Sequence, residues 1–259
     1  MSEPILSISK LNKSFGPVHV LHDVDFQVHP GEVTALVGDN GAGKSTLVKC
    51  IAGIHSLDSG EITFEGNPVT IADPRAATAL GIEFVYQDLA LADNLDITQN
   101  MFLGREIRRA GSFLNDGEME QQARKTLASL SVRTVSSVRQ LVANLSGGQR
   151  QTVAIAKAVL WNSKVVFLDE PTAALGVAQT RQVLDLVRRL ADQGRGVVLI
   201  SHNMNDVMEV ADRVAALYLG RVAAEVKTED TSTTQIVELI TSGRSGDVGL
   251  APATANESI

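Results

Sequence analysis

The amino-acid sequence predicts an α/β fold in which helices cover a largely parallel sheet. Short β-rich runs alternate with segments of helical periodicity, which is the pattern of α/β proteins. Two runs, residues 165–168 and 197–200, contain only apolar side chains, as expected for central strands that are buried on both faces. The other expected strands are residues 5–9, 24–28, 33–37 and 214–217.

Three segments carry apolar residues at helical spacing, namely residues 183–190, 204–211 and 119–130. Gly194 is a plausible end for the first helix. Asn115, with Glu118 three residues later, approximates a capping box before the third. That third helix lies in a region with few strand signals, so we expect a separate and mostly helical lobe there.

The composition and charge of the chain limit the classes of protein to which it can belong. The 259 residues are 44% hydrophobic, which suffices for one domain with a smaller inserted lobe. A net charge of −7 argues against a nucleic-acid binder but does not exclude one, because a local basic patch can exist in an acidic chain. Cys50 is the only cysteine, so no internal disulfide is possible and a reducing compartment is indicated. We see no signal peptide and no apolar stretch of about 20 residues. The end of the chain, 243–259, reads as a disordered tail.

The run GDNGAGKS at residues 38–45 fits the phosphate-loop pattern G-x-x-x-x-G-K-[ST]. An apolar strand precedes it and a helical run, residues 46–53, follows it. Glycines let backbone N–H groups turn toward phosphate oxygens, and the helix N-terminus adds its positive end. Lys44 is expected to reach the β- and γ-phosphates, and Ser45 to ligate Mg²⁺. The residues expected to contact the nucleotide here are Gly38, Asp39, Asn40, Gly41, Ala42, Gly43, Lys44, Ser45 and Thr46.

The apolar run 165–168 ends in two carboxylates, Asp169 and Glu170. A strand beside the phosphate loop would bring Asp169 to the Mg²⁺ shell. Glu170 would then orient or deprotonate the attacking water, which requires a carboxylate within hydrogen-bond reach. Two solvated acids at a strand end are the structural alternative.

The run LSGGQ at residues 145–149 opens another expected helix, residues 150–160. Ser146 and Gln149 fit a capping box. Gly147 and Gly148 expose backbone N–H groups at the helix N-terminus, which makes an anion site. Both interpretations can hold together.

LSGGQ is the signature sequence of ABC (ATP-binding cassette) ATPases, and the chain resembles that family from about residue 5 to residue 240. The resemblance implies a P-loop NTPase cassette over residues 1–242, with a RecA-like core, an antiparallel β subdomain and a helical subdomain at about 88–160. It implies ATP and Mg²⁺ as ligands and ATP hydrolysis as the activity. It also implies a head-to-tail dimer, in which residues 146–149 of one copy bind the γ-phosphate of ATP held by the other.

Smaller motifs also match the family. Phe15 stands where an aromatic stacks on adenine, although an ordinary core phenylalanine is the alternative. Gln87 matches the glutamine that senses Mg²⁺ and water, and His202 the histidine that contacts the γ-phosphate. The resemblance thus makes Glu170, His202, Lys44 and Gln87 candidate catalytic residues, and Ser45, Gln87 and Asp169 candidate metal ligands.

One position departs from the family pattern. The family usually reads Ser-Ala-Leu-Asp after Pro171 and Thr172, and this chain has Gly176 where the aspartate would be. That aspartate communicates across the dimer, so its replacement bears on coupling between the two sites and removes no catalytic group.

Softer matches at residues 86–91, 171–177 and 200–204 resemble bacterial monosaccharide importers of the ribose, xylose and fructose type, nearest to single-cassette fructose-import ATPases. The resemblance implies two transmembrane permeases as partners, docked on the helical lobe where residues 88–104 form part of a groove. A sugar-binding protein would be an indirect partner, and nucleic acid is not expected. The chain would sit on the cytoplasmic face of the membrane through its permeases alone.

Two other classes of protein share some of these features. A soluble, non-transport ABC-type ATPase, such as an iron–sulfur cluster assembly ATPase, has a similar length and is the main alternative. A GTPase or small-molecule kinase would share only the phosphate loop. The sequence has no Asn-Lys-x-Asp guanine motif, and the LSGGQ run and His202 argue against that third class.

Overall fold

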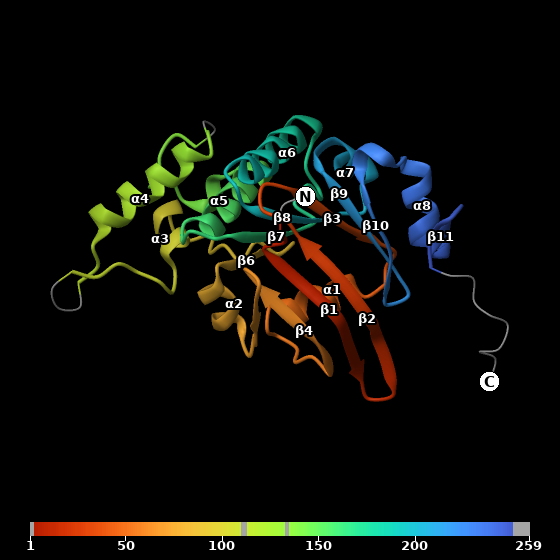
Figure 1. Ribbon diagram of the computed structural model, residues 1–259. Helices are drawn as coiled ribbons and strands as arrows, with labels where there is room; N and C mark the ends of the chain where they lie inside the picture. The colour runs from red at the N-terminus through yellow and green to blue at the C-terminus, as the bar shows by residue number, and fades with distance from the viewer. Residues whose placement is uncertain (1–2, 110–112, 133–134, 251–259) are drawn as a thin grey trace.

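A six-stranded sheet forms the centre of the computed structural model, which describes residues 3–109, 113–132 and 135–250 (Figure 1). Its strand order is β10-β9-β3-β8-β7-β6. The five strands from β9 to β6 run parallel, and β10 pairs antiparallel with β9 at one edge. The strands are β3 (Val33–Gly38), β6 (Ile82–Val85), β7 (Val165–Asp169), β8 (Gly196–Ile200), β9 (Arg213–Tyr218) and β10 (Arg221–Lys227).

A second, antiparallel sheet has the order β2-β1-β4-β5. It consists of β1 (Leu6–Phe15), β2 (Val18–Val28), β4 (Ser59–Phe64) and β5 (Asn67–Val69). Side chains on its inner face pack with helix α1 (Lys44–Ile51) and with one face of the central sheet, in a single apolar cluster that includes Phe26, Leu47 and Phe167. Helix α1 is therefore buried between two sheets.

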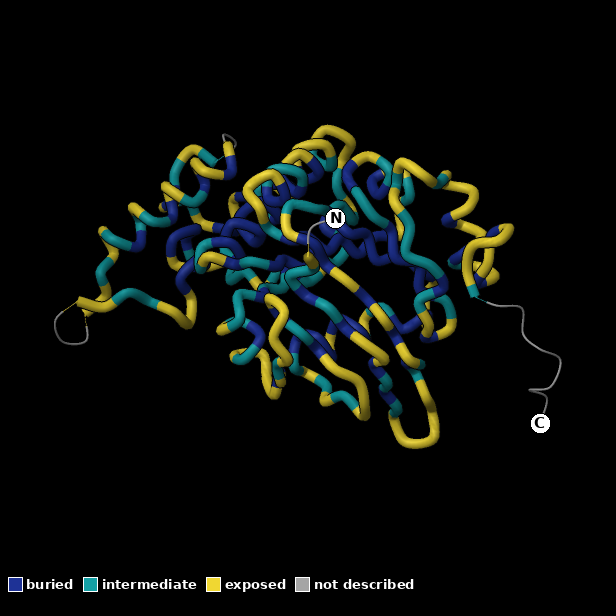
Figure 2. The backbone as a smooth tube through the Cα atoms, viewed as in Figure 1, coloured by how far each residue is buried: buried dark blue, intermediate teal, exposed yellow. Residues whose placement is uncertain are grey.

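The other face of the central sheet is covered by helices. Successive residues of a strand point to opposite faces, and in β7 Val165 and Phe167 join the first cluster while Val166 and Leu168 join a second. This second cluster includes residues of α6 (Val177–Asp192), α7 (Met204–Val210) and α8 (Thr233–Ser242). Figure 2 shows the resulting buried band through the sheet.

Between β6 and β7 the chain is helical, in the region where the sequence predicts a helical lobe. It forms α3 (Ile97–Phe102), α4 (Asp116–Ser129), the short helix η1 (Val142–Asn144) and α5 (Gly147–Val159). Helices α3 and α4 extend away from the two sheets (Figure 1), and α5 packs against both α3 and α6. Helix α2 (Pro74–Leu80) precedes β6 in the chain and lies beside it. In the residues described above, each helix is too short or too polar to cross a bilayer.

The predicted α/β class is confirmed, with parallel core and antiparallel subdomain, and two details differ. The acidic strand β7 does not lie directly beside β3, because β8 runs between them. Helix α5 begins at Gly147 rather than at residue 150, because Ser146 already caps it.

The prediction of a disordered tail from residue 243 is wrong for residues 243–250. Gly243 ends α8 with a left-handed φ of 75°, and β11 (Arg244–Ser245) then pairs with β12 (Val248–Gly249). Leu250 packs against the core, and the buried Ser245 donates a hydrogen bond to Glu238. The composition of this segment, which is rich in small polar residues, does not indicate the contacts that Leu250 and Ser245 make. The rest of the predicted tail, 251–259, lies outside the described residues.

Candidate active site

The predicted site residues meet at the carboxyl edge of the central sheet. Parallel strands end at the same edge, and ligands of open α/β sheets bind in the crevice outside those ends. The phosphate loop follows β3, His202 follows β8, the two carboxylates end β7, and Gln87 follows β6. Together they line a cleft of 910 Å³, whose predicted members are Gly38, Asp39, Asn40, Gly41, Gly43, Lys44, Ser45, Thr46, Gln87, Asp169, Glu170 and His202.

The phosphate loop requires glycine at its two ends. Gly38 has a φ of 157°, and a Cβ there would lie 2.4 Å from the carbonyl oxygen of Leu217. Gly43 has a φ of 107°, and a Cβ there would lie 2.8 Å from the Leu21 side chain. Gly43 is also the N-cap of α1 and supplies no side-chain hydrogen bond to it. The first N–H groups of α1 therefore have no side-chain cap and can receive an anion.

Lys44 lies half-buried across the mouth of this loop. Its ammonium Nζ donates to the backbone oxygens of Gly38 at 2.6 Å and Asp39 at 3.1 Å. Burial lowers the pKa of Lys44, against the opposing charges of Glu170, Asp39 and Asp169. The ammonium is thus held by neutral carbonyl groups, which a phosphate can replace as a stronger partner.

The two carboxylates at the end of β7 have different surroundings. Burial, and then the charge of Glu170, raise the pKa of Asp169, against the opposing charges of Lys44 and Lys49. Glu170 lies next to His202, whose Nδ1 is 2.8 Å from Glu170 Oε1. The Glu170 side chain is 16% exposed and the His202 ring 76% exposed. The imidazole therefore orients a carboxylate that faces the cleft.

The oxygen donors at this edge fit a magnesium ion. Ser45, Gln87 and Asp169 offer hydroxyl, amide and carboxylate oxygens, which are the hard ligands that Mg²⁺ prefers. In the part of the chain that the structure describes, no cluster of three or more His, Cys, Asp or Glu side chains could hold a metal. Mg²⁺ commonly uses one or two carboxylates together with phosphate oxygens and water.

The LSGGQ run lies outside this cleft, at the start of α5. Ser146 caps α5, its Oγ accepting from the Gln149 backbone at 3.4 Å while the Gln149 side chain accepts from the Ser146 backbone at 2.9 Å. The predicted capping box is therefore confirmed. Ser146 and Gly147 are exposed, whereas Gly148 is buried. The residues lining the cleft of the same chain do not include any of the four, 146–149.

Two other predicted residues do not line the cleft with their side chains. Ala42 is buried in the core beneath the loop. Phe15 is 43% exposed at the end of β1, where the His55 ring meets it edge-on at 5.1 Å and Lys13 Nζ lies 5.4 Å from its centroid. Val20, in the next strand, lines the cleft instead. An isolated valine after a polar turn carries no sequence signal for such a position.

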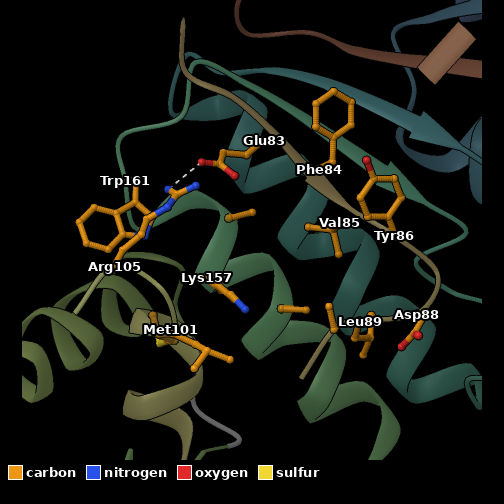
Figure 3. Close-up of a pocket in the computed structure, with 14 residues that line it drawn as sticks. Glu83, Phe84, Val85, Tyr86, Asp88, Leu89, Met101, Arg105, Lys157 and Trp161 are labelled. Carbon is orange, nitrogen blue, oxygen red and sulfur yellow. Dashed lines mark hydrogen bonds and ion pairs between the residues drawn. The ribbon is translucent and has the colours of Figure 1, made fainter. Parts of the chain in front are cut away.

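A second, smaller cleft of 160 Å³ lies where β6 meets the helical lobe (Figure 3). Arg105 pairs with Glu83 at 3.0 Å and places its guanidinium 5.5 Å from the centroid of the Trp161 ring. Lys157 lies in the same cleft, and burial followed by the charge of Arg105 lowers its pKa. The segment predicted to form a groove, 88–104, contributes five of its residues, namely Asp88, Leu89, Ala90, Met101 and Leu103.

Comparison with known proteins agrees with this geometry. Residues 21–173 match the family described as ABC transporter. The chain is 46% identical to the xylose/arabinose import ATP-binding protein XylG of Sulfolobus acidocaldarius, over 95% of this chain and 97% of that protein. It is also 46% identical to the fructose import ATP-binding protein FrcA of Rhizobium meliloti, over 93% of this chain and 95% of that protein.

A solved structure shares the fold as well. It is the ADP conformation of an ATP-binding cassette of an ABC transporter, with a TM-score of 0.79 and 25% identity, covering 93% of this chain and 96% of that one. The phosphate loop, the acidic strand end and the LSGGQ run all lie within the residues that match the family, 21–173. The chain therefore belongs to the ABC transporter family, as one of its ATP-binding and ATP-hydrolysing cassettes.

Proposed function

We propose that this chain is the ATP-hydrolysing subunit that drives a monosaccharide importer. The observation that carries the proposal is the convergence of phosphate loop, carboxylate pair and His202 in one cleft. The transport substrate class is supported by 46% identity, over nearly full length, to relatives named for xylose/arabinose and fructose import. Those names favour transport over the soluble, non-transport ATPase that the sequence leaves as an alternative.

The phosphate loop binds the phosphates of ATP. The open N–H groups at the start of α1 and the Lys44 ammonium supply the positive end of the site. Ser45, Gln87 and Asp169 would hold Mg²⁺, which, when bound, neutralises negative charge on the phosphate oxygens. Phe15, exposed at the end of β1, is the candidate platform for adenine.

Glu170 is the general base in this proposal. A carboxylate that accepts the proton of the attacking water must be oriented toward it, and the 2.8 Å contact with His202 provides that orientation. With its proton on Nδ1, the His202 ring donates to Oε1 of Glu170, and the other carboxylate oxygen, Oε2, takes the proton of the attacking water. Hydrolysis then depends on positioning and charge stabilisation, with no covalent intermediate.

A second copy of the chain completes the site. Ser146 and Gly147 are exposed and lie outside the cleft of their own chain, so the Ser146 hydroxyl and the Gly147 backbone would be the groups that meet the γ-phosphate held by a partner. A head-to-tail dimer with two-fold symmetry would complete both sites at once.

Permeases dock on the helical lobe, at the cleft of Figure 3. Its walls combine an apolar surface from Leu89 and Met101 with the charges of Arg105 and Lys157, which suits a short amphipathic helix. The chain would reach the cytoplasmic face of the membrane through two such permeases. A sugar-binding protein outside the membrane would contact the permeases and not this chain.

The Glu170→Gln variant tests this proposal. We expect it to bind ATP as the parent does, to lose at least about 99% of its turnover, and to accumulate as a nucleotide-bound dimer in size-exclusion chromatography, because the amide cannot accept the proton. Parent-like turnover would contradict the assignment of the base. Copurification of the same variant with two membrane permeases separates the importer from a soluble ATPase.

A further inference from the structure

Asp206 is a buried carboxylate that the roles above do not use. It lies in the first turn of α7 and is 5% exposed. Its Oδ2 accepts from the Thr172 hydroxyl at 2.6 Å, and its Oδ1 accepts from the Asn203 side-chain amide at 3.0 Å. One carboxylate therefore joins two loops that follow different strands, β7 and β8.

The two loops joined by Asp206 carry the two residues of the proposed proton-transfer site. Thr172 follows Glu170 by two positions, and Asn203 comes directly after His202. On the Asn203 side, the backbone N–H donates to the Ser201 hydroxyl at 3.0 Å, which fixes the loop just before and after the histidine. The contact between Glu170 and His202 is therefore one link between these loops, and Asp206 forms another.

Glu170 needs such support because its backbone conformation is unfavourable. Its φ is 48°, in the left-handed region that non-glycine residues rarely adopt. Its N–H donates to the backbone oxygen of Ile200 at 2.9 Å, and its own oxygen accepts from Ala173 at 3.1 Å. Residues in this region persist only where the surrounding structure holds them, and they cluster at functional sites. Thr172 lies inside the turn that Glu170 and Ala173 close.

Burying a carboxylate at this position costs desolvation free energy. The two side chains that donate to it, Thr172 and Asn203, are neutral groups, so these hydrogen bonds must offset the cost of burying it. An apolar side chain would cost less if packing were its only role. The position thus serves the geometry of the two loops.

We propose that Asp206 is a positioning residue for hydrolysis, which holds the Glu170 loop and the His202 loop at their working separation through Thr172 and Asn203. This inference rests on the proposed roles of Glu170 and His202 and adds what sets their distance. Asp206 and Thr172 do not line the nucleotide cleft. Loss of the tie should therefore slow the chemical step and leave ATP binding unchanged.

The test compares Thr172→Val with Thr172→Ser. Valine matches threonine in shape and removes only the hydroxyl, whereas serine keeps it. We expect Thr172→Val to lower kcat about tenfold or more, with the KM for ATP within about twofold of the parent. Thr172→Ser, which keeps the hydroxyl, should retain most of the parent kcat. Thr241→Val, a threonine of α8 whose hydroxyl bonds only within its own helix, is the matched control and should keep the parent kcat.

Two results would overturn the inference. One is an unchanged kcat in Thr172→Val, and the other is an equal loss in Thr172→Ser, which would show that the hydroxyl is not the relevant group. Glu170→Gln is measured alongside. If Glu170→Gln is inactive while Thr172→Val is fully active, only the positioning role fails, whereas parent-like turnover in Glu170→Gln contradicts the proposed function itself. Thermal unfolding and ATP titration of each variant show that the folded, ATP-binding protein is being compared.

Discussion

Helices α1 and α5 both begin at a loop that contains glycine, and the two loops are built differently. At the start of α1, Gly43 is the N-cap and leaves the first N–H groups without a side-chain cap. At the start of α5, Ser146 and Gln149 satisfy such groups from within the chain. The first loop lies in a cleft with Lys44 and two carboxylates, whereas the second lies outside that cleft.

The difference indicates a division of labour between the two loops. A phosphate loop without a cap, with a lysine held across its mouth, is ready to receive an anion within its own chain. A capped loop is stable without a ligand, and its exposed end can act only on a phosphate brought to it.

Replacing Lys44 by alanine should abolish high-affinity ATP binding, with a loss of about a hundredfold or more, because the phosphate charge would lose its ammonium partner. Isothermal titration with ATP measures this. Lys49→Ala is the matched control, since Lys49 lies on the same helix and is exposed; its affinity should stay within about threefold of the parent. Full ATP binding by Lys44→Ala would contradict the role of the first loop.

Replacing Ser146 by arginine should leave ATP affinity within about threefold and lower kcat about a hundredfold, because the second loop contacts a phosphate only across the dimer. Steady-state turnover and ATP titration of the same preparation separate the two quantities. Ser129→Arg, on the exposed end of α4, controls for an added charge on the helical lobe. Equal losses of ATP affinity and turnover would show that the second loop serves only as a structural cap of α5.

The stability of α5 should depend on its cap. Ser146→Ala is expected to lower the free energy of unfolding by about 1 kcal/mol, whereas Ser146→Gly should lower it by only a few tenths of that amount. Urea denaturation measures both. Loss of ATP binding on the same scale is not expected in either variant, because Ser146 lies outside the cleft of its own chain.

The reactivity of Cys50 tests how firmly the helix of the first loop is buried. Burial raises the pKa of its thiol to about 11, so the thiol is protonated at pH 8 and is a poor nucleophile. Alkylation of the native protein at pH 8 should be slower than alkylation of the urea-unfolded chain by about a hundredfold or more. Equal rates would show that α1 opens readily from between the two sheets.

Much of the site could be predicted because its residues stand in fixed positions relative to single strands. The phosphate loop follows an apolar strand, the carboxylates end another, and Ser146 with Gln149 forms a capping box that is local in the sequence. The order of strands is not local, so β8 between β3 and β7 was missed. Roles of individual residues in ATP hydrolysis stay predictions.

Tertiary contacts account for what the sequence could not indicate. Asp206 and Thr172 are 34 positions apart, and neither belongs to a motif that implies a contact between them. Val20 reaches the cleft only because β2 crosses near the phosphate loop. The C-terminal hairpin depends on Leu250 reaching the core, which a composition rich in small polar residues conceals.

The most direct test of the central claim, that each site takes its first loop from one chain and its second from another, is to mix two inactive variants. In a homodimer of Lys44→Ala, or of Ser146→Arg, both sites carry the substitution and are inactive. A mixed head-to-tail dimer has one site with both defects and one site with none. An equimolar mixture should therefore recover about a quarter of the parent turnover, since half of the dimers are mixed and each has one intact site. A mixture as inactive as its two components would contradict the account.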